Sequence, residues 1–311
     1  MGKTAFIFPG QGAQYCGMGK DFFDIFDTAK KVYVTAGEAA GLDVGELCFT
    51  ENDRLDITEY TQIAMLATEV AILKVLEEKG LRADCAAGLS LGEYGALAAA
   101  GVMELPGLFR LVRCRGIYMQ EAYPQGGAMS AVLGLDAEKI RNICAETEGI
   151  VSIANDNCPG QIVITGEAQA VQAASVRLQE AGAKRCIPLK VSGPFHSRLL
   201  AGAGEKLAAE LEGVEVKRPA IPYICNVEAS YITEAAPIKD LLARQVSSTV
   251  RWRESMELML ADGVDTFIEI GPGKTLAGFL KKMSRDVKVI NIGTVTDMEC
   301  IPELLGKNGR C

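Results

Sequence analysis

Short apolar runs alternate along this chain with longer stretches in which apolar residues recur at helical spacing. Thr4–Phe8 is a run of the first kind that ends at Pro9-Gly10, which predicts a buried strand closed by a turn. Thr61–Lys79 has helical spacing and stops at Gly80, a residue type that commonly ends helices. Because strand and helix then alternate, we expect a parallel sheet with helices on its faces. The elements predicted next are a strand at Cys85–Leu89 and helices at Leu91–Ala100 and Glu104–Ala122.

The middle of the chain has a different order of predicted elements. A strand, a helix, two strands, a helix and a last strand follow one another, which is the β-α-β-β-α-β order of a ferredoxin-like unit. Since this unit is a complete small fold, we predict an inserted subdomain at residues 125–193, between residues 1–124 and 194–311 of a larger part. A cleft is expected where the two parts meet. The six elements are predicted at Ala128–Leu135, Asp136–Glu148, Val151–Asn155, Gln161–Thr165, Ala168–Ala181 and Arg185–Val191.

The first pattern returns after the predicted insertion. A helix is predicted to follow Ser197. Strands are predicted near Ile221–Val227, Thr266–Ile270 and Val287–Ile292. The chain is therefore expected to belong to the α/β class, with two subdomains.

The composition limits the classes of protein to consider. The chain has 311 residues, 49% of them hydrophobic, and a formal net charge of −8 from 32 basic and 40 acidic residues. Nucleic-acid-binding proteins need a basic footprint, so this balance disfavours them. No apolar segment approaches the roughly 20 residues that span a bilayer, and a strand-like run begins directly after Lys3 with no export leader. We expect a soluble, cytoplasmic protein.

The ten cysteines and the single histidine give little support to a metal or disulfide site. No two cysteines form a C-x-x-C arrangement, and residues such as Cys48 and Cys114 stand alone among apolar neighbours. One histidine is a poor basis for a zinc site. We predict neither a bound metal nor a disulfide framework.

Gly88-Leu89-Ser90-Leu91-Gly92 is a G-x-S-x-G sequence between a predicted strand and a predicted helix. A serine on so sharp a turn needs glycine on both sides, because a Cβ atom there would collide with neighbouring backbone. The turn exposes the hydroxyl group, and the next helix directs its N-terminal amides toward it. The Leu91 N–H would then help to hold an oxyanion. We interpret Ser90 as a nucleophile; the alternative is a purely structural turn.

His196 is the only imidazole available to activate that serine. It lies in Gly193-Pro194-Phe195-His196-Ser197, a turn-rich joint where the inserted unit returns to the larger part. A lone histidine is commonly a surface or capping residue, but this position favours a general base. No acidic third member is evident, so a backbone carbonyl could orient the ring by accepting from Nδ1–H.

Three further segments have candidate chemistry. The glycines around Gln11 in Phe8–Gly12 suit a tight loop whose backbone N–H approaches a ligand closely. Arg115 lies in the helix at Glu104–Ala122; a solvated basic face is its default interpretation, and it would matter if the substrate carried a carboxylate. Gly271–Thr275 ends like a phosphate-binding loop, but the first glycine of that motif would fall on Ile268, so we reject this function.

Six motifs follow one another along the chain: FPGQG at Phe8–Gly12, GLSLGEY at Gly88–Tyr94, RG-x-x-MQEA at Arg115–Ala122, N-x-PGQ-x-VI-x-G at Asn157–Gly166, GPFHS at Gly193–Ser197 and EIGPG at Glu269–Gly273. Together they resemble a known family over nearly the whole chain: the malonyl-CoA:acyl carrier protein transacylases of fatty-acid synthesis. The family's fold is a large α/β-hydrolase-like subdomain with an inserted ferredoxin-like subdomain, which agrees with the predicted order of elements.

The resemblance implies roles for residues of this chain. Ser90 is expected to be the nucleophile, His196 its base and Arg115 the clamp on the malonyl carboxylate. The backbone amides of Gln11 and Leu91 are expected to form the oxyanion hole.

The same resemblance bears on four more positions. The main-chain carbonyl that orients the histidine in the family maps to Arg251 in Val250-Arg251-Trp252. Asn157 belongs to a family motif near the cleft, without a clear role. Many relatives have histidine where this chain has Leu89, a difference that affects packing or acyl tolerance rather than the base. Phe195 resembles the malonyl-selective form of its motif.

The expected activity is transfer of malonyl from malonyl-CoA to the phosphopantetheine thiol of acyl carrier protein, without a metal or redox cofactor. The family's carrier protein is acidic, so a basic patch is expected, with Lys184, Arg185 and Lys190 as candidates. A monomer is expected. The open alternatives are an acyltransferase that serves a polyketide synthase, a serine hydrolase and a catalytically silent carrier-binding module.

Overall fold

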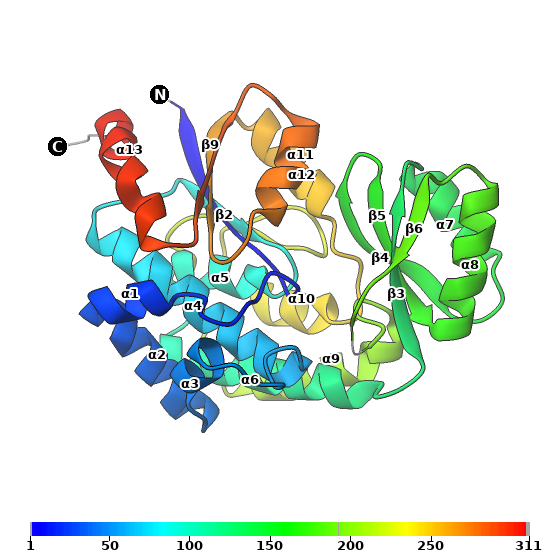
Figure 1. The fold of residues 1–311 in the computed structure, drawn as a ribbon, viewed down its shortest axis with the longest axis horizontal. Coiled ribbons are helices and arrows are strands. Elements are labelled where there is room, and N and C mark those ends of the chain that lie inside the picture. The colour runs from blue at the N-terminus through cyan, green and yellow to red at the C-terminus, as the bar shows by residue number, and fades with distance from the viewer. Residues whose placement is uncertain (1, 192, 309–311) are drawn as a thin grey trace.

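Two β-sheets organise the chain into a large and a small lobe. The computed structural model describes residues 2–191 and 193–308. In Figure 1 the large lobe lies to the left and the small lobe to the right. Both chain ends belong to the large lobe, and the small lobe is formed by a segment from the middle of the chain. The fold is α/β, with one largely parallel and one antiparallel sheet, as predicted.

The large lobe is built on a six-stranded sheet in the order β10-β9-β1-β2-β7-β8. All neighbouring strands are parallel except β7 and β8. The central strand β1 (Lys3–Phe8) is buried on both faces, because Phe6 and Phe8 point to one core and Ala5 and Ile7 to another. The other strands are β2 (Cys85–Gly88), β7 (Tyr223–Ile224), β8 (Tyr231–Ile232), β9 (Val264–Ile270) and β10 (Lys288–Ile292).

Helices cover both faces of this sheet, as expected for a strand with two buried faces. One face packs on α4 (Thr58–Glu78), which is buried almost all round, and on α5 (Gly92–Ala99). The other face packs on α11 (Trp252–Ala261) and α12 (Thr275–Met283). The remaining helices of this lobe are α1 (Lys20–Ile25), α2 (Asp27–Ala40), α3 (Val44–Phe49), α6 (Leu105–Ala122), α9 (Ala201–Glu212), α10 (Ile238–Gln245) and α13 (Ile301–Asn308), with short 3-10 turns at Arg198–Leu200 and Val295–Cys300.

The small lobe has the ferredoxin-like topology that the sequence predicts. Its sheet is antiparallel in the order β4-β5-β3-β6. Val132, Ile162 and Ile164 face the two helices of this lobe, whereas Met129 and Val163 face the large lobe. The elements are β3 (Gly127–Leu133), α7 (Ala137–Ala145), β4 (Val151–Cys158), β5 (Gln161–Glu167), α8 (Ala168–Glu180) and β6 (Arg185–Pro188).

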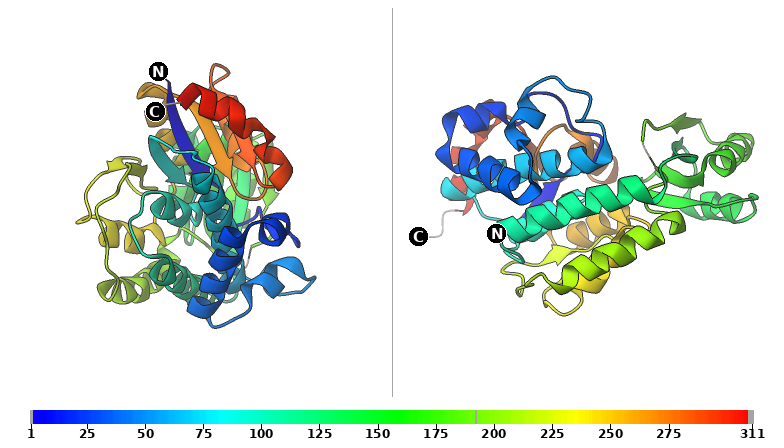
Figure 2. Two further views of the ribbon diagram at one scale, coloured as in Figure 1. Left: turned by 90° about the vertical axis from the view of Figure 1, so that its left-hand side faces the viewer. Right: turned by 90° about the horizontal axis from the view of Figure 1, so that it is seen from below.

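The chain crosses between the lobes twice. It enters the small lobe directly from α6 and returns through residues 189–197 to α9, which lies beside α6 in the view from below (Figure 2). The last strand was predicted to reach Val191, but β6 ends at Pro188, and Leu189 and Val191 line the cleft. The ladder with β3 ends at the Ser130–Pro188 pair, and one further backbone bond follows, from the Leu189 N–H to the Met129 carbonyl at 3.0 Å.

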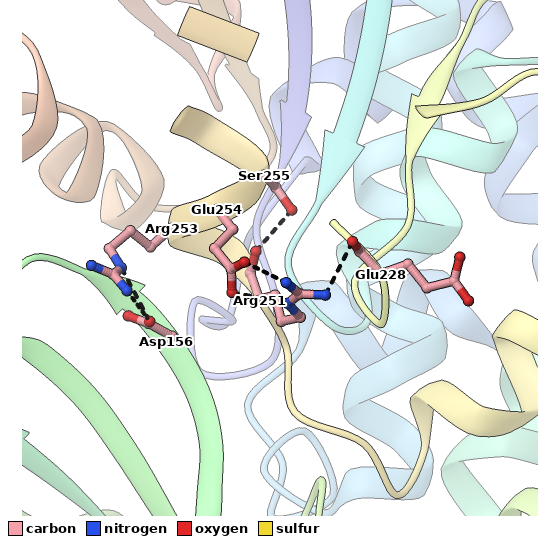
Figure 3. A network of polar contacts seen from close by, with 6 residues as sticks. All are labelled: Asp156, Glu228, Arg251, Arg253, Glu254 and Ser255. Carbon is pink, nitrogen blue, oxygen red and sulfur yellow. Dashed lines mark hydrogen bonds and ion pairs between the residues drawn. The ribbon is translucent and has the colours of Figure 1, made fainter. Parts of the chain in front are cut away.

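A second connection ties the small lobe to the segment before α11. The Asp156 N–H on β4 donates to the Val250 carbonyl at 3.0 Å, and the Val250 N–H donates to the Ala154 carbonyl at 2.8 Å. The Arg253 guanidinium adds an ion pair to the Asp156 carboxylate at 2.9 Å (Figure 3). The edge of the small sheet is therefore fixed to the large lobe by backbone and side-chain bonds.

Among the described residues, no helix combines the length and apolar character needed to cross a membrane.

Candidate active site

A cleft of about 250 Å³ lies between the lobes and collects most of the residues singled out from the sequence. The large lobe contributes the loops after β1 and β2, together with Arg115 and His196. The small lobe contributes apolar side chains such as Met129 and Val163, and the polar Asn157. The cleft therefore has charged and polar groups on the large lobe and faces both apolar and amide side chains of the small lobe.

Ser90 lies on a sharp turn between β2 and α5. Its φ of 56° falls in the left-handed region, a backbone conformation that residues other than glycine rarely adopt. A Cβ atom on Gly88 would lie 1.8 Å from the Gly92 carbonyl oxygen, and one on Gly92 would lie 2.1 Å from the Phe8 carbonyl oxygen. The two flanking glycines are thus required by close backbone contacts, as the sequence predicted.

Asn226, which follows β7, holds this turn in place. Its Oδ1 accepts from the Ser90 N–H at 2.6 Å, and its Nδ2 donates to the Gly88 carbonyl at 2.7 Å. Both bonds are made to the strained backbone rather than to the reactive hydroxyl group. Sequence analysis missed Asn226, because a single asparagine after a short strand is not distinctive.

His196 is buried and contacts Ser90 directly. Its Nε2 lies 2.7 Å from the Ser90 Oγ. Its Nδ1 lies 3.0 Å from the Gln245 carbonyl oxygen and 3.1 Å from that of Ser248. A carbonyl only accepts, so Nδ1 has the proton and Nε2 accepts from the serine hydroxyl. Burial, and then the charge of Arg115, lower the pKa of His196 to about 4.

The carbonyl that orients this histidine was predicted at Arg251, and this prediction was wrong. Arg251 immediately precedes α11, so its carbonyl accepts from the Ser255 N–H at 3.0 Å, as in any first helical turn, and from the Ser255 Oγ at 2.9 Å (Figure 3). Its side chain bonds to Glu254 and to the Glu228 carbonyl instead. The carbonyls at the end of α10 and just beyond it are free to face the imidazole.

Arg115 is fully buried at 1% exposure and has no carboxylate partner within 4.0 Å in the described part of the chain. Its Nη1 donates to the Gln62 Oε1 at 2.7 Å, and its Nη2 donates to the Gln245 Oε1 at 2.9 Å. The same Nη2 lies 3.4 Å from the Ser90 Oγ. A solvated helix face is therefore ruled out for this arginine. It is a buried cation next to the candidate nucleophile, in the position to bind an anion.

Glu93 is the second buried charge of the site. Its Oε2 accepts from the Gln245 Nε2 at 2.6 Å and from the Asn226 N–H at 3.0 Å. Burial raises the pKa of Glu93 to about 7, against the opposing effects of these two bonds and of Arg115. Sequence analysis passed over Glu93 and Gln245; the only available signal for Glu93 was a carboxylate in an otherwise apolar helix.

Two backbone amides face the same space as the serine. Leu91 precedes the first residue of α5, and Gln11 lies in the loop after β1. The two loops touch, since a Cβ atom on Gly10 would lie 2.6 Å from the Leu89 carbonyl oxygen. Neither amide donates to an acceptor within the described residues, which leaves both available to an oxyanion. The Gln11 side chain turns away and donates to the Thr58 hydroxyl at 3.1 Å.

The remaining candidate residues occupy different surroundings. Asn157 on β4 lines the cleft and is 6% exposed, and its Oδ1 has no hydrogen-bond partner in the part of the chain that the structure describes. Lys184, Arg185 and Lys190 are exposed on the small lobe, outside the cleft lining. Within residues 2–191 and 193–308 no cluster of three or more His, Cys, Asp or Glu side chains is arranged to hold a metal ion.

The chain matches the family described as the acyl transferase domain over residues 5–303. The class of protein is therefore an acyltransferase, with the cleft between its two lobes as the candidate active site. It is 46% identical over 306 residues to the malonyl CoA-acyl carrier protein transacylase of Bacillus subtilis, covering 97% of this chain and 96% of that protein. The protein of the same name from Haemophilus influenzae is 42% identical, with 98% and 100% covered. The chain belongs to the malonyl CoA-acyl carrier protein transacylase family.

Solved structures agree with this assignment. The crystal structure of MCAT from Streptococcus pneumoniae matches with a TM-score of 0.94 at 47% identity, covering 97% of this chain and 100% of that one. A complex of a type II PKS acyl-carrier protein with its malonyl-transacylase also matches with a TM-score of 0.94, at 40% identity and 97% and 99% coverage. The fold, with both of its subdomains, is that of this family.

Proposed function

We propose that this chain moves a malonyl group from malonyl-CoA to the phosphopantetheine thiol of acyl carrier protein through an ester on Ser90. The relatives at 46% and 42% identity have the name malonyl CoA-acyl carrier protein transacylase. The observation that supports the proposal most is the 2.7 Å contact between Ser90 and His196, beside a buried arginine that has no carboxylate partner among residues 2–191 and 193–308.

The first half-reaction loads the enzyme. His196 Nε2 takes the proton of the Ser90 hydroxyl as Oγ attacks the thioester carbonyl of malonyl-CoA. The amides of Gln11 and Leu91 stabilise the resulting oxyanion. The C–S bond then breaks, and the leaving thiolate of coenzyme A takes the proton from His196. The product is a malonyl-serine ester.

The second half-reaction reverses the first with another thiol. His196 accepts the proton of the phosphopantetheine thiol, the sulfur attacks the ester carbonyl, and the Ser90 oxygen leaves with that proton. Every bond and proton in the two steps belongs to serine, imidazole or a substrate thiol. The mechanism therefore calls for no metal or redox cofactor, and it follows ping-pong kinetics.

Arg115 gives the reaction its preference for malonyl. Its Nη2 is 3.4 Å from the Ser90 Oγ, so an acyl group on that oxygen brings its free carboxylate close to the guanidinium. A charge-assisted pair of this kind stabilises binding by about 1.5–3 kcal/mol. A serine hydrolase has no need for such a residue, which favours the transferase over that alternative.

Two kinds of carrier protein are candidates for the second substrate. The relative that serves a type II PKS carrier protein is 40% identical, so a polyketide carrier stays a candidate beside a fatty-acid one. The exposed Lys184, Arg185 and Lys190 offer positive charge to an acidic carrier on the small lobe. Parallel transfer assays with carrier proteins of both pathways separate the two.

The first prediction is the covalent intermediate itself. Malonyl-CoA without a carrier protein is expected to add one malonyl group to the enzyme, and peptide mapping is expected to find it on Ser90. Ser90→Ala is the matched control and should stay unmodified by intact-mass analysis. A wild-type enzyme without an adduct, or with the adduct on a cysteine, contradicts the proposal. Light scattering on the same preparation tests the expected monomer.

A further inference from the structure

Arg115 and Glu93 are two opposite charges that are buried together without touching. Neither forms an ion pair within 4.0 Å inside the described part of the chain, and Arg115 is 1% exposed, as is Glu93. The Gln245 side chain lies between them. Its Nε2 donates to Glu93 at 2.6 Å, and its Oε1 accepts from Arg115 at 2.9 Å. The two charges therefore interact through one amide group.

The orientation of this amide is fixed by a third bond. Gln245 Nε2 also donates to the Ser90 carbonyl at 3.0 Å, so both of its N–H groups have acceptors. The amide cannot rotate by half a turn without placing Oε1 against two acceptors, and Oε1 must therefore face Arg115. Glu93 is thus linked to the guanidinium through one amide of defined orientation.

We propose that Glu93 is the resting counter-charge of Arg115, and that it takes up one proton from solvent when the malonyl carboxylate binds to Arg115. The inference rests on the proposed function, because it requires a carboxylate on the acyl group. In the resting cleft the positive and negative charges cancel wherever Glu93 is ionised. A bound carboxylate adds a negative charge that is compensated by neither solvent nor another cation, and protonation of Glu93 restores neutrality.

The groups that surround Glu93 leave it as the natural acceptor of this proton. Tyr94 on α5, together with Tyr223 and Cys225 at β7, face it, and burial raises the pKa of each, so they are already neutral. The Glu93 carboxyl has a pKa of about 7 and is divided between both forms near neutral pH. Arg115 lowers that pKa, and a ligand that neutralises Arg115 removes this effect.

The other titratable groups nearby are less suited. His196 also responds to Arg115, but its pKa of about 4 lies well below neutral pH. Glu69 on α4 lies on the other side of α5, next to Gly95, and burial raises its pKa well above the usual range. Glu69 therefore already has its proton before the substrate binds.

Calorimetry measures the proton directly. Ser90→Ala binds malonyl-CoA or acetyl-CoA without reacting, and titrations at pH 7.5 in phosphate and in Tris separate the heat of binding from the heat of buffer ionisation. Uptake of about 0.5–0.8 proton is expected for malonyl-CoA beyond the value for acetyl-CoA. Acetyl-CoA shares every phosphate of the ligand, so the difference reports the carboxylate alone.

Glu93→Gln identifies the group that takes the proton. The variant keeps an oxygen that accepts from Gln245 and Asn226 and removes the charge. We expect the malonyl-specific uptake to disappear in the Ser90→Ala/Glu93→Gln protein. Uptake that persists assigns the proton to another group and overturns the inference. In the catalytically intact enzyme, the malonyl-to-acetyl preference should weaken by up to tenfold per pH unit above pH 7, and should become independent of pH in Glu93→Gln.

Infrared difference spectra provide a test without a change at residue 93. Malonyl-CoA, but not acetyl-CoA, should produce the C=O band of a protonated carboxyl group, shifted in protein made with ¹³C-glutamate. Normal loading of Ser90 without this band overturns the Glu93 inference and leaves the proposed function intact. Absent loading of Ser90 by malonyl-CoA overturns both.

Discussion

Arg115 illustrates at the residue scale how burial changes the meaning of a side chain. In the sequence it is one of several basic residues on a helix, and Arg110 on the same helix is exposed. In the fold its guanidinium contacts the amide oxygens of Gln62 and Gln245 and lies over the Tyr94 ring at 5.3 Å. Its direct partners are neutral, and the nearest opposite charge, Glu93, lies beyond the Gln245 amide, so a bound anion can contact the guanidinium directly.

Replacing Arg115 is expected to change acyl selectivity more than folding. Arg115→Ala should reduce use of malonyl-CoA by roughly ten- to a few-hundred-fold, because it removes a charge-assisted pair of about 1.5–3 kcal/mol. Acetyl-CoA should become relatively better used, since no unpaired cation remains. Arg115→Lys should recover part of the loss, as lysine lacks the planar fork.

Loading kinetics with both thioesters measure this ratio, and Arg110→Ala on the same helix is the matched control. A selectivity ratio that does not change in Arg115→Ala removes the physical basis of malonyl recognition at this site.

His196 leads to a prediction about pH. Its lowered pKa of about 4 keeps the imidazole neutral, and so able to accept the serine proton, well below the usual range for histidine. The value of kcat/KM for Ser90 loading should therefore show no histidine-dependent fall between pH 7 and about pH 5. The fall of kcat on the acid side should occur at a higher pH than the fall of kcat/KM, because the bound malonyl carboxylate neutralises Arg115 and so raises the pKa of His196.

His196→Ala is the comparison for this profile. It should lower transfer by about 10²- to 10⁴-fold and abolish the acid limb, while circular dichroism shows a folded protein. A limb of kcat/KM near the ordinary pKa of a free imidazole contradicts the predicted environment.

At the scale of elements, the active site depends on where strands and helices end. Ser90 occupies the junction of β2 and α5, and the ring of His196 faces the end of α10. The backbone of both residues is left-handed, with φ values of 56° and 60°. Such strain persists only where neighbouring groups hold it. At the serine the neighbour is Asn226.

Asn226→Ala is expected to relax this turn. The change leaves the Ser90 N–H and the Gly88 carbonyl without their partners, at a cost of about 1–3 kcal/mol for each buried group. We expect a lower melting temperature and slower malonylation of Ser90, with little change in the malonyl-to-acetyl ratio, since Arg115 is untouched. The exposed Asn142→Ala on α7 is the control. An unchanged loading rate in Asn226→Ala contradicts the prediction, since the turn then keeps its conformation without the Asn226 side chain.

At the scale of the whole molecule, one segment of the large lobe bonds to the small lobe and also orients the general base. Residues 249–253 bond to the edge strand β4, and Gln245 and Ser248 just before them orient the imidazole. The placement of the small lobe and the orientation of the general base therefore depend on adjacent backbone.

The core of the large lobe also contains acids that have no solvent contact.

Glu69 leads to a prediction about the stability of the whole protein. Burial raises its pKa well above the usual value, and neither carboxyl oxygen has a hydrogen-bond partner among the described residues. The folded protein then keeps a proton that the unfolded chain releases above about pH 4.3. Stability is therefore highest at low pH for this group and falls as pH rises, by up to about 1.4 kcal/mol per pH unit, until Glu69 ionises in the fold.

Glu69→Gln should flatten this dependence and raise the melting temperature at pH 8 relative to pH 5. The exposed Glu180→Gln serves as control. Thermal unfolding of the three proteins between pH 5 and 8 decides the matter. Parallel curves for wild type and Glu69→Gln contradict the prediction.

The sequence by itself determined the order of elements and the local geometry of the nucleophile. The β-α-β-β-α-β order follows from periodicity that each segment contains in itself, and the structure confirms it. The turn at Ser90 follows from its two flanking glycines, because the backbone approaches both so closely that a Cβ atom would not fit. The helices α1–α3 were not predicted, because their short amphipathic patterns are weak signals when they are taken alone.

Only the tertiary structure decided which groups surround the nucleophile. Glu93, Asn226 and Gln245 come from separate segments and meet through side-chain bonds that no local pattern encodes. The carbonyl that orients His196 was misplaced for the same reason, since the start of α11 engages Arg251 and leaves Gln245 and Ser248 free. Local spacing specifies backbone conformation, whereas the partner of a buried polar atom depends on distances set by the packing of the entire chain.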